Sequence, residues 1–350
     1  MLLAGAALPA SAFAQCVTNA PSVDACLGGV RQTTPSASLD LDFMTPGALN
    51  PALTFTRAST GTYFDNTGTM QTASANAPRW DYDPTTLALR GMLIEEARTN
   101  LFLNSATLVT QNVTITAQVY TLSFYGTGTI TYSGVASGPL IGAGAFPQRA
   151  SVSFTPTAGT LTCTVTGSVL NAQIEAGAMA SSWIPTVGAA ATRSADLCSM
   201  PVGAWFSASA SSLAVDYMLR QSPNPSGGLR FATVINDGGA TNRIALIAQT
   251  ASSATSLVST VVASATSNTP GLGAGSANAV TKLAGAWGGG SASGALNGGS
   301  VQTVAVGVPS GLTTLAIGQN SVGLYVNGHI RRVRYWNQAL APADLQAVTA

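Results

Sequence analysis

Short stretches of alternating apolar and polar residues run through the chain, and turn residues separate them. Residues 39–43 (LDLDF) and 54–57 (TFTR) alternate in this way, as half-buried strands do. Residues 120–125 (YTLSFY) and 160–165 (TLTCTV) also read as strands, and turns such as 65–68 (DNTG) follow about every 8–12 residues. This spacing predicts an all-β chain of antiparallel sandwiches or jelly rolls.

The second half has the same character. Strands are predicted over residues 213–219, 230–235, 242–248, 257–263, 301–306, 313–317 and 330–336. Residues 236–239 (NDGG) predict a hairpin turn. Residues 264–300 are rich in Ser, Ala, Gly and Asn, and predict long loops around one or two weak strands. Short helices are predicted over residues 91–102 and 342–348.

The composition excludes several classes of function. Charged residues make up 8% of the 350 residues, and the formal net charge is +1. Nucleic-acid binding needs clustered Lys and Arg, so we expect no nucleic-acid partner and no polybasic membrane patch. The body of the chain contains no apolar run long enough to predict a membrane span. The length allows two domains of ordinary size.

The N-terminal residues 1–14 are apolar and small, and Ala12-Phe13-Ala14 fits a signal-peptidase site. The segment predicts a secretory signal peptide cleaved after Ala14, and hence an extracellular protein. No Lys or Arg precedes the apolar stretch, so an uncleaved apolar arm is the alternative. Residues 15–38 are rich in Pro, Ser, Thr and Gly and predict a linker.

The four cysteines allow three complete pairings. Cys16 and Cys26 lie close enough in sequence to close a small loop outside the cytoplasm. Cys163 alternates with apolar residues in a predicted strand, so we expect it to be a buried thiol. Cys198 is the fourth cysteine. No Cys or His spacing is typical of zinc, and the single histidine, His329, excludes a His-rich metal site.

Residues 80–84 (WDYDP) are the strongest candidate for sugar contacts. A sugar site pairs an aromatic face with carboxylates or amides that bind hydroxyl groups. Trp80, Asp81 and Tyr82 supply both kinds of group, and Trp287 is a further aromatic candidate. The alternative is a turn at Asp83-Pro84 with the aromatic rings packed against a sandwich.

Other candidates are weaker. Asp216 and Asp237 could supply oxygen ligands to calcium, but the rest of a calcium cage is not apparent, and a plain hairpin turn explains Asp237 as well. No other cofactor is indicated. Neighbouring Glu95 and Glu96 do not converge as glycosidase carboxylates must, so salt bridges to Arg90 or Arg98 are expected.

No nucleophile accompanies His329, which we interpret as an ordinary strand-edge residue, and no catalytic residue is predicted. Arg331, Arg332 and Arg334 form the one basic cluster of the sequence. Alternation places Arg332 and Arg334 on the face of Trp336, which favours a solvated face or a subunit contact.

One long stretch is more specific than these patterns. Residues 55–59 (FTRAS), 62–65 (TYFD), 79–84 (RWDYDP) and 90–100 (RGMLIEEARTN) resemble a segment of bacteriophage and prophage head-spike or tail-fibre proteins. Residues 106–196 resemble the carbohydrate-binding-module-like sandwich that follows this segment. Residues 197–350, which close on YVNGHIRRVRYWNQALAPADLQ, resemble a concanavalin A-like, laminin G-type domain.

The resemblance implies a non-enzymatic spike or fibre protein of the virion surface, with 39–105 as the fibre-type segment. Its implied partners are a host cell-surface polysaccharide, other virion proteins and further copies of the chain in a homo-oligomer. Two alternatives stay open. A secreted bacterial lectin-like protein would have a cleaved N-terminus at Gln15, and a polysaccharide-degrading enzyme would need two converging carboxylates in a cleft.

Overall fold

The computed structural model describes residues 34–350 apart from 48, 222–227, 251–254 and 321. The predicted signal peptide and the Cys16 and Cys26 loop lie outside the described residues, as does nearly all of the predicted linker. Residues Ala37–Ala350 form one compact unit built almost wholly from antiparallel strands, so the predicted all-β fold class is confirmed.

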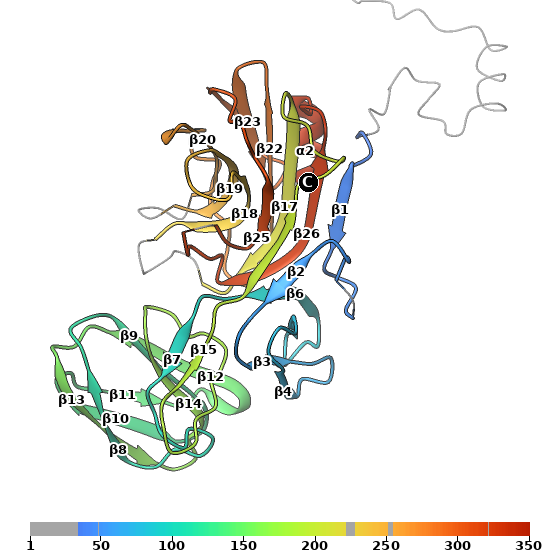
Figure 1. Ribbon diagram of the computed structural model, residues 1–350. Coiled ribbons are helices and arrows are strands. Elements are labelled where there is room, and N and C mark those ends of the chain that lie inside the picture. Colours follow the sequence, from blue (N-terminus) through green and yellow to red (C-terminus); the bar gives the residue numbers. More distant parts are fainter. Residues whose placement is uncertain (1–33, 48, 222–227, 251–254, 321) are drawn as a thin grey trace, which may run out of the picture. The chain divides into compact units, whose positions relative to one another are not determined.

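The larger sandwich has an eight-stranded sheet as its first layer. The strand order is β24-β23-β22-β17-β26-β6-β5, and β1 pairs with β26 beside this path. Figure 1 labels β23, β22, β17 and β26 of this sheet. The strands are β1 (Leu39–Asp42), β5 (Trp80–Tyr82), β6 (Leu89–Ile94), β17 (Ser211–Leu219), β22 (Val280–Gly288), β23 (Ser291–Leu296), β24 (Gln302–Ala305) and β26 (Gly328–Trp336).

A seven-stranded sheet in the order β2-β16-β25-β18-β19-β20-β21 forms the second layer. Its strands are β2 (Thr54–Thr56), β16 (Leu197–Pro201), β18 (Arg230–Asn236), β19 (Arg243–Gln249), β20 (Leu257–Val262), β21 (Ala265–Asn268) and β25 (Thr314–Ile317). Leu213 and Val215 of β17 share one buried cluster with Ile235 and Leu246 of the second layer. Burial of these apolar faces against each other holds the two sheets together.

The smaller sandwich packs a four-stranded sheet, β11-β10-β13-β8, on a three-stranded sheet, β12-β9-β14. Its strands are β8 (Gln111–Ile115), β9 (Tyr120–Gly126), β10 (Thr129–Gly134), β11 (Gly138–Ile141), β12 (Gly144–Phe154), β13 (Gly159–Thr166) and β14 (Leu170–Ala176). Leu122 and Phe124 of β9 meet Ile130 and Leu161 in its core. Cys163 is fully buried there, as predicted.

Two separate strand pairs and one helix complete the described fold. β3 (Gly61–Phe64) pairs with β4 (Met70–Ala73), and β7 (Arg98–Asn100) pairs with β15 (Ala191–Arg193). The predicted C-terminal helix is confirmed as α2 (Pro342–Thr349), which buries Leu345 and Val348 in a cluster with Trp336. Among the described residues, no helix is long and apolar enough to span a membrane.

The helix predicted over residues 91–102 is wrong, since this stretch forms the end of β6, a short connection and β7. Its apolar residues are buried because β6 lies inside a sheet, between β5 and β26. Gly91 has φ +124° and lies against β26, where an added Cβ would come within 2.5 Å of the Ile330 carbonyl oxygen. A continuous apolar run suits a buried strand as well as a helix. Here pairing with β5 and β26 makes the run a strand.

The fibre-type segment is not a separate layer of the fold. β1, β5 and β6 extend the first sheet of the larger sandwich, and β2 extends the second. Figure 1 shows blue β1 beside red β26, near the opposite end of the chain. Strand pairs therefore join residues on either side of the predicted domain boundaries at 105 and 196.

Candidate functional site

Four arginines and two carboxylates form a largely buried network at or next to the ends of strands β2, β5, β6, β15, β16 and β17. The two oxygens of Asp196 bind separate arginines. Arg57 Nη1 lies 3.0 Å from Oδ1, and Arg79 Nη2 lies 2.5 Å from Oδ2, with both pairs fully buried. The Glu95 amide also donates to Asp196 Oδ2 at 2.9 Å. We call Arg57, Arg79, Glu95, Arg193, Asp196 and Arg220 the ion network.

Glu95 is the second anion of the ion network. Arg79 Nη1 lies 3.0 Å from its Oε2 atom, and Arg220 Nη1 lies 2.8 Å from Oε1. The Ser182 hydroxyl donates to Oε2 at 2.7 Å. Burial alone would raise the pKa of Glu95, but the charges of Arg193, Arg79 and Arg220 outweigh it and hold that pKa well below its usual range.

The predicted partners of the glutamates are partly correct. Glu96 pairs with Arg98, as expected, whereas Glu95 belongs to the ion network and Arg90 pairs with Asp83 at 2.7 Å. Several residues of the phage-like motifs, including Arg57, Arg79 and Glu95, are therefore interior ion partners. A buried charge needs a fixed partner, and each of these side chains has one in the ion network.

Asp81 is also buried, and both of its carboxylate oxygens have partners within the chain. Its Oδ2 atom lies 2.8 Å from His329 Nε2, and its Oδ1 atom accepts the Phe64 amide at 2.8 Å. Burial lowers the pKa of His329 although the Asp81 charge opposes this, so a neutral imidazole donates from Nε2. The strand-edge interpretation of His329 is wrong, because β26 lies between β17 and β6 and the side chain is buried.

A solvent-open cleft of about 780 Å³ lies over one face of the three-stranded sheet. Thr121 and Tyr125 of β9 line it together with Arg149, Ser151 and Ser153 of β12. Its other walls include Phe64, Asp83, Pro84, Thr85, Arg90, Met179, Ala180, Arg220 and Asn278. The cleft thus draws on both sandwiches and on the fibre-type segment.

Strand register explains why this face is polar. Arg149 pairs with Tyr125 and Ser151 pairs with Ser123, so their side chains share a face. The alternate pair, Ala150 with Phe124, turns into the apolar core of the smaller sandwich. The sequence YTLSFY therefore contains the signal for the cleft, in the residues that alternate with Leu122 and Phe124.

Aromatic rings gather along the cleft. The ring of Tyr125 lies 5.3 Å from that of Phe146 and 6.3 Å from that of Phe64, and Phe64 and Phe146 are 5.9 Å apart, all measured between centroids. Tyr125 is buried, whereas Phe146, next to the lining residue Pro147, is 41% exposed. Phe146 is not itself a lining residue, but its part-exposed ring packs on Phe64 and Tyr125, which do line the cleft.

Arg149 is the distinctive cation of the cleft. Its Nη1 donates to the Ser181 carbonyl at 2.5 Å and its Nη2 donates to the Ser123 hydroxyl at 2.8 Å. The guanidinium carbon lies 5.4 Å from the Tyr125 centroid, and Nε is buried without a partner in the described part of the chain. A guanidinium has more N–H donors than these bonds use, so Arg149 keeps donors for a ligand.

Asp83 and Arg90 form a pair on another wall. The Thr85 and Thr86 amides both donate to Asp83 Oδ1 at 2.9 Å, which confirms the predicted turn at Asp83-Pro84. Burial opposes ionisation of Asp83, but these amides and Arg90 lower its pKa to about 2. Asp83 is therefore anionic at neutral pH and neutralises Arg90.

The structure does not gather the predicted glycan-binding residues into one site. Trp80 and Tyr82 are half-buried on β5, and neither lines the cleft, although Asp83 and Pro84 beside them do. Strands β17, β26 and β6 separate β22 from β5, which puts Trp287 on the order of 20 Å from Trp80. No finding tests whether these residues contact a glycan, so that stays a prediction.

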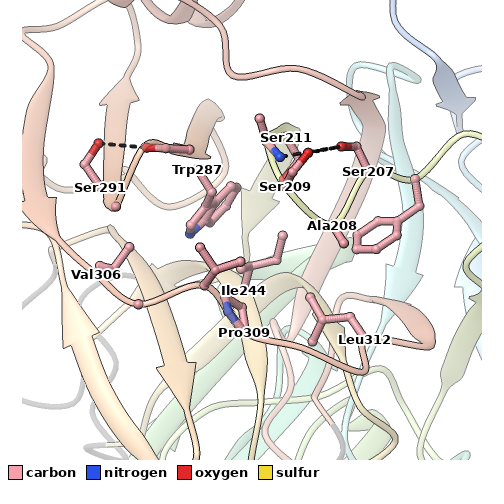
Figure 2. A pocket seen from close by; sticks show the side chains of 16 residues that line it. Ser207, Ala208, Ser209, Ser211, Ile244, Trp287, Ser291, Val306, Pro309 and Leu312 are labelled. Atoms are coloured by element: carbon pink, nitrogen blue, oxygen red, sulfur yellow. Dashed lines mark hydrogen bonds between the residues drawn. The ribbon is translucent and has the colours of Figure 1, made fainter.

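Trp287 lies instead in a small pocket of about 20 Å³ in the larger sandwich (Figure 2). Ile244, Val306 and Leu312 line this pocket, with Ser207 and Ser291 among its polar residues. The indole is 6% exposed, and its Nε1 donates to the Thr260 hydroxyl at 2.8 Å. The ring is thus largely used in core packing rather than presented at a surface.

The calcium candidates and the basic cluster have partners within the chain. Arg334 Nη2 lies 3.4 Å from Asp216, while Asp237 accepts the Gly239 and Asn242 amides at 2.9 Å in the predicted hairpin turn. The described residues contain no cluster of three or more His, Cys, Asp or Glu side chains that could hold a metal ion. Arg334 covers the Trp336 ring, as alternation predicted.

Comparison with known proteins finds distant structural neighbours. No protein-family model and no curated protein matches the chain. Among solved structures, it is similar to domain 4 of a GH43 extracellular arabinanase from Geobacillus stearothermophilus in complex with arabinotriose. The identity is 16%, the match covers 45% of this chain and 73% of that one, and the TM-score is 0.39.

Two further neighbours are equally distant. The Ruminococcus gnavus IT-sialidase CBM40 bound to alpha2,3 sialyllactose is 13% identical over 41% of this chain and 84% of its own, with a TM-score of 0.33. A heptameric SAP-like pentraxin from Limulus polyphemus is 10% identical over 73% of this chain and 82% of its own, with a TM-score of 0.31. TM-scores this low carry no argument about function, which must come from the cleft itself.

Proposed function

We propose that the protein binds a carbohydrate in the cleft over β9 and β12, without catalysing a reaction. The observation that carries this proposal is the combination of groups along one open cleft. The part-exposed ring of Phe146, which packs on the lining residues Phe64 and Tyr125, can cover the apolar face of a sugar, while Ser151 and Arg149 supply hydrogen-bonding groups for its hydroxyls. Sugar sites combine these two kinds of contact.

The carboxylates around the cleft support a non-catalytic role. A glycosidase of the usual kind needs two carboxyl groups that face the scissile bond. Among the described residues, Asp83 is the one acidic residue that lines the cleft, and Arg90 and two amides bind it. Glu175 shares the strand face but accepts the Ser181 amide and hydroxyl, and it does not line the cleft.

A finer proposal concerns where the protein acts. The resemblance of residues 55–100 to phage head-spike and tail-fibre proteins supports host attachment from a virion surface. Detection of the chain in purified phage particles by mass spectrometry would support this role. A processed chain that starts at Gln15 in the culture medium would favour the secreted lectin-like alternative.

Binding of the full chain to an array of neutral and acidic polysaccharides tests the carbohydrate proposal. We expect binding that weakens when Phe146→Ala removes the exposed ring. Ile141→Ala is the matched control, because this side chain is 67% exposed on β11, in the other sheet of the same sandwich. Absence of binding to every polysaccharide, or equal losses in both variants, would contradict the proposal.

A further inference from the structure

We infer that the cleft selects acidic saccharides and that Arg149 is the residue that recognises their carboxylate or sulfate group. The inference rests on the proposed carbohydrate function and narrows it to one class of ligand. Its basis is the set of charged groups in the cleft and the way each one is paired.

Three arginines line the cleft, namely Arg90, Arg149 and Arg220, against the single acidic side chain of Asp83 in the described residues. Asp83 neutralises Arg90 at 2.7 Å, and the buried Glu95 lies 2.8 Å from Arg220. No carboxylate lies within 4.0 Å of Arg149 in the part of the chain that the structure describes. The cleft therefore carries an excess of positive charge, and among its three arginines Arg149 is the one with no carboxylate partner in the described residues.

The position of Arg149 suits recognition rather than packing alone. The Ser181 carbonyl, the Ser123 hydroxyl and the Tyr125 ring hold the guanidinium in one orientation. A fixed guanidinium loses little freedom when it binds an anion, and its planar array of donors matches a carboxylate or a sulfate. An acidic sugar would complete a charge pair that the protein itself leaves open.

Neutral polysaccharide is the competing ligand class. A neutral sugar can use the Phe146 ring and the serine hydroxyls, but it would leave Arg149 without a counter-charge. The two classes differ in their response to salt, because screening weakens a charge pair and leaves ring stacking largely unchanged. A negative charge added elsewhere in the cleft should weaken binding of the acidic class and leave binding of the neutral class unchanged.

Titration of the full chain with polygalacturonate, hyaluronan and polysialic acid, each beside its carboxyl-reduced form, tests the inference. We expect the acidic polymers to bind more tightly than the reduced ones, and high salt to narrow the difference. Arg149→Gln should weaken acidic binding by about tenfold or more, since hydrogen bonds to charged groups are the strong ones. Arg332→Gln is the matched control, an arginine paired with Asp40 outside the cleft.

A second variant keeps the test valid if Arg149→Gln folds poorly. Gln148 is exposed and lines the cleft, so Gln148→Glu adds a negative charge without removing a buried contact. We expect it to weaken acidic binding and leave the thermal midpoint unchanged.

The outcomes separate this inference from the carbohydrate proposal. Equal binding of acidic and reduced polymers, sensitive to Phe146→Ala but not to Gln148→Glu, would overturn the acidic inference and keep the carbohydrate function. Acidic binding that neither Arg149→Gln nor Gln148→Glu weakens would also overturn it. Binding of no polymer would overturn both.

Discussion

The ion network and the cleft both contain several arginines, but the arginines have different partners. In the ion network, Arg57 and Arg79 share the buried carboxylate of Asp196, and Glu95 binds Arg79 and Arg220. In the cleft, Arg149 contacts a carbonyl, a hydroxyl and an aromatic ring. Arginine with a buried counter-charge stabilises the fold, whereas arginine without one at an open cleft is available to a ligand.

Removal of Asp196 should have the largest effect on stability. Asp196→Asn leaves Arg57 and Arg79 buried beside a neutral amide, and breaking a buried pair in this way costs about 3–5 kcal/mol. Chemical denaturation of the variant should show that loss in the free energy of unfolding. A loss below about 1 kcal/mol in the free energy of unfolding would mean that the ion network contributes little to the stability of the fold.

The Asp81 and His329 pair should make stability depend on pH. The pKa of folded His329 lies below its usual value of 6.5, so the unfolded chain takes up a proton first as the pH falls. Stability is therefore fully present well above pH 6.5 and should decrease as the pH falls from 7 to 5. Denaturation midpoints at both pH values measure this change.

Because the chain contains a single histidine, the pH dependence of stability can be assigned to His329. In His329→Gln the difference between pH 7 and pH 5 should largely disappear, because no other side chain of the chain has an ordinary pKa in that range. If the variant keeps the same pH dependence, another group is responsible and the proposed neutral state of His329 is wrong.

Arg149→Gln should destabilise the fold only modestly, by about 1 kcal/mol, because the side chain gives up hydrogen bonds to neutral groups at the edge of a cleft. The same denaturation experiment checks this value. A loss as large as that of Asp196→Asn would place Arg149 with the ion network and weaken its assignment to a ligand.

Arg332→Gln should show the smallest effect, below about 1 kcal/mol. The side chains of Arg332 and Asp40 are 43% and 40% exposed, and such surface pairs contribute little. Salt should reduce even this contribution. A larger loss would indicate that strand β1 depends on the pair for its place beside β26.

Much of the fold follows from the sequence, for reasons that are local. Alternation and turn residues correctly predict strands such as β9, β18 and β26, and the short C-terminal helix α2 was also predicted. The same reasoning missed β6 because a buried strand and a short helix share an apolar run. It underestimated β22 and β23, whose Ala, Ser and Gly residues look like loop. At Gly285, a Cβ would come within 2.9 Å of Val258 and Trp287, so close packing requires the small residue.

The candidate site was harder to predict, because it depends on contacts between distant segments. The sequence drew attention to Asp81, which the fold buries against His329 more than two hundred positions away. No sequence pattern marked Arg149 or Phe146, because the register of β12 against β9 determines which side chains they lie beside. The sequence analysis did not predict the ion network, which contains Arg57, Arg79 and Glu95.

The most direct test of the account is a crystal structure of the full chain with an acidic oligosaccharide that it binds in solution. We predict the sugar in the cleft over β9 and β12, with its acidic group within hydrogen-bond distance of Arg149 and a ring against Phe146. A sugar bound elsewhere, such as in the pocket of Trp287, would contradict the assignment of the cleft.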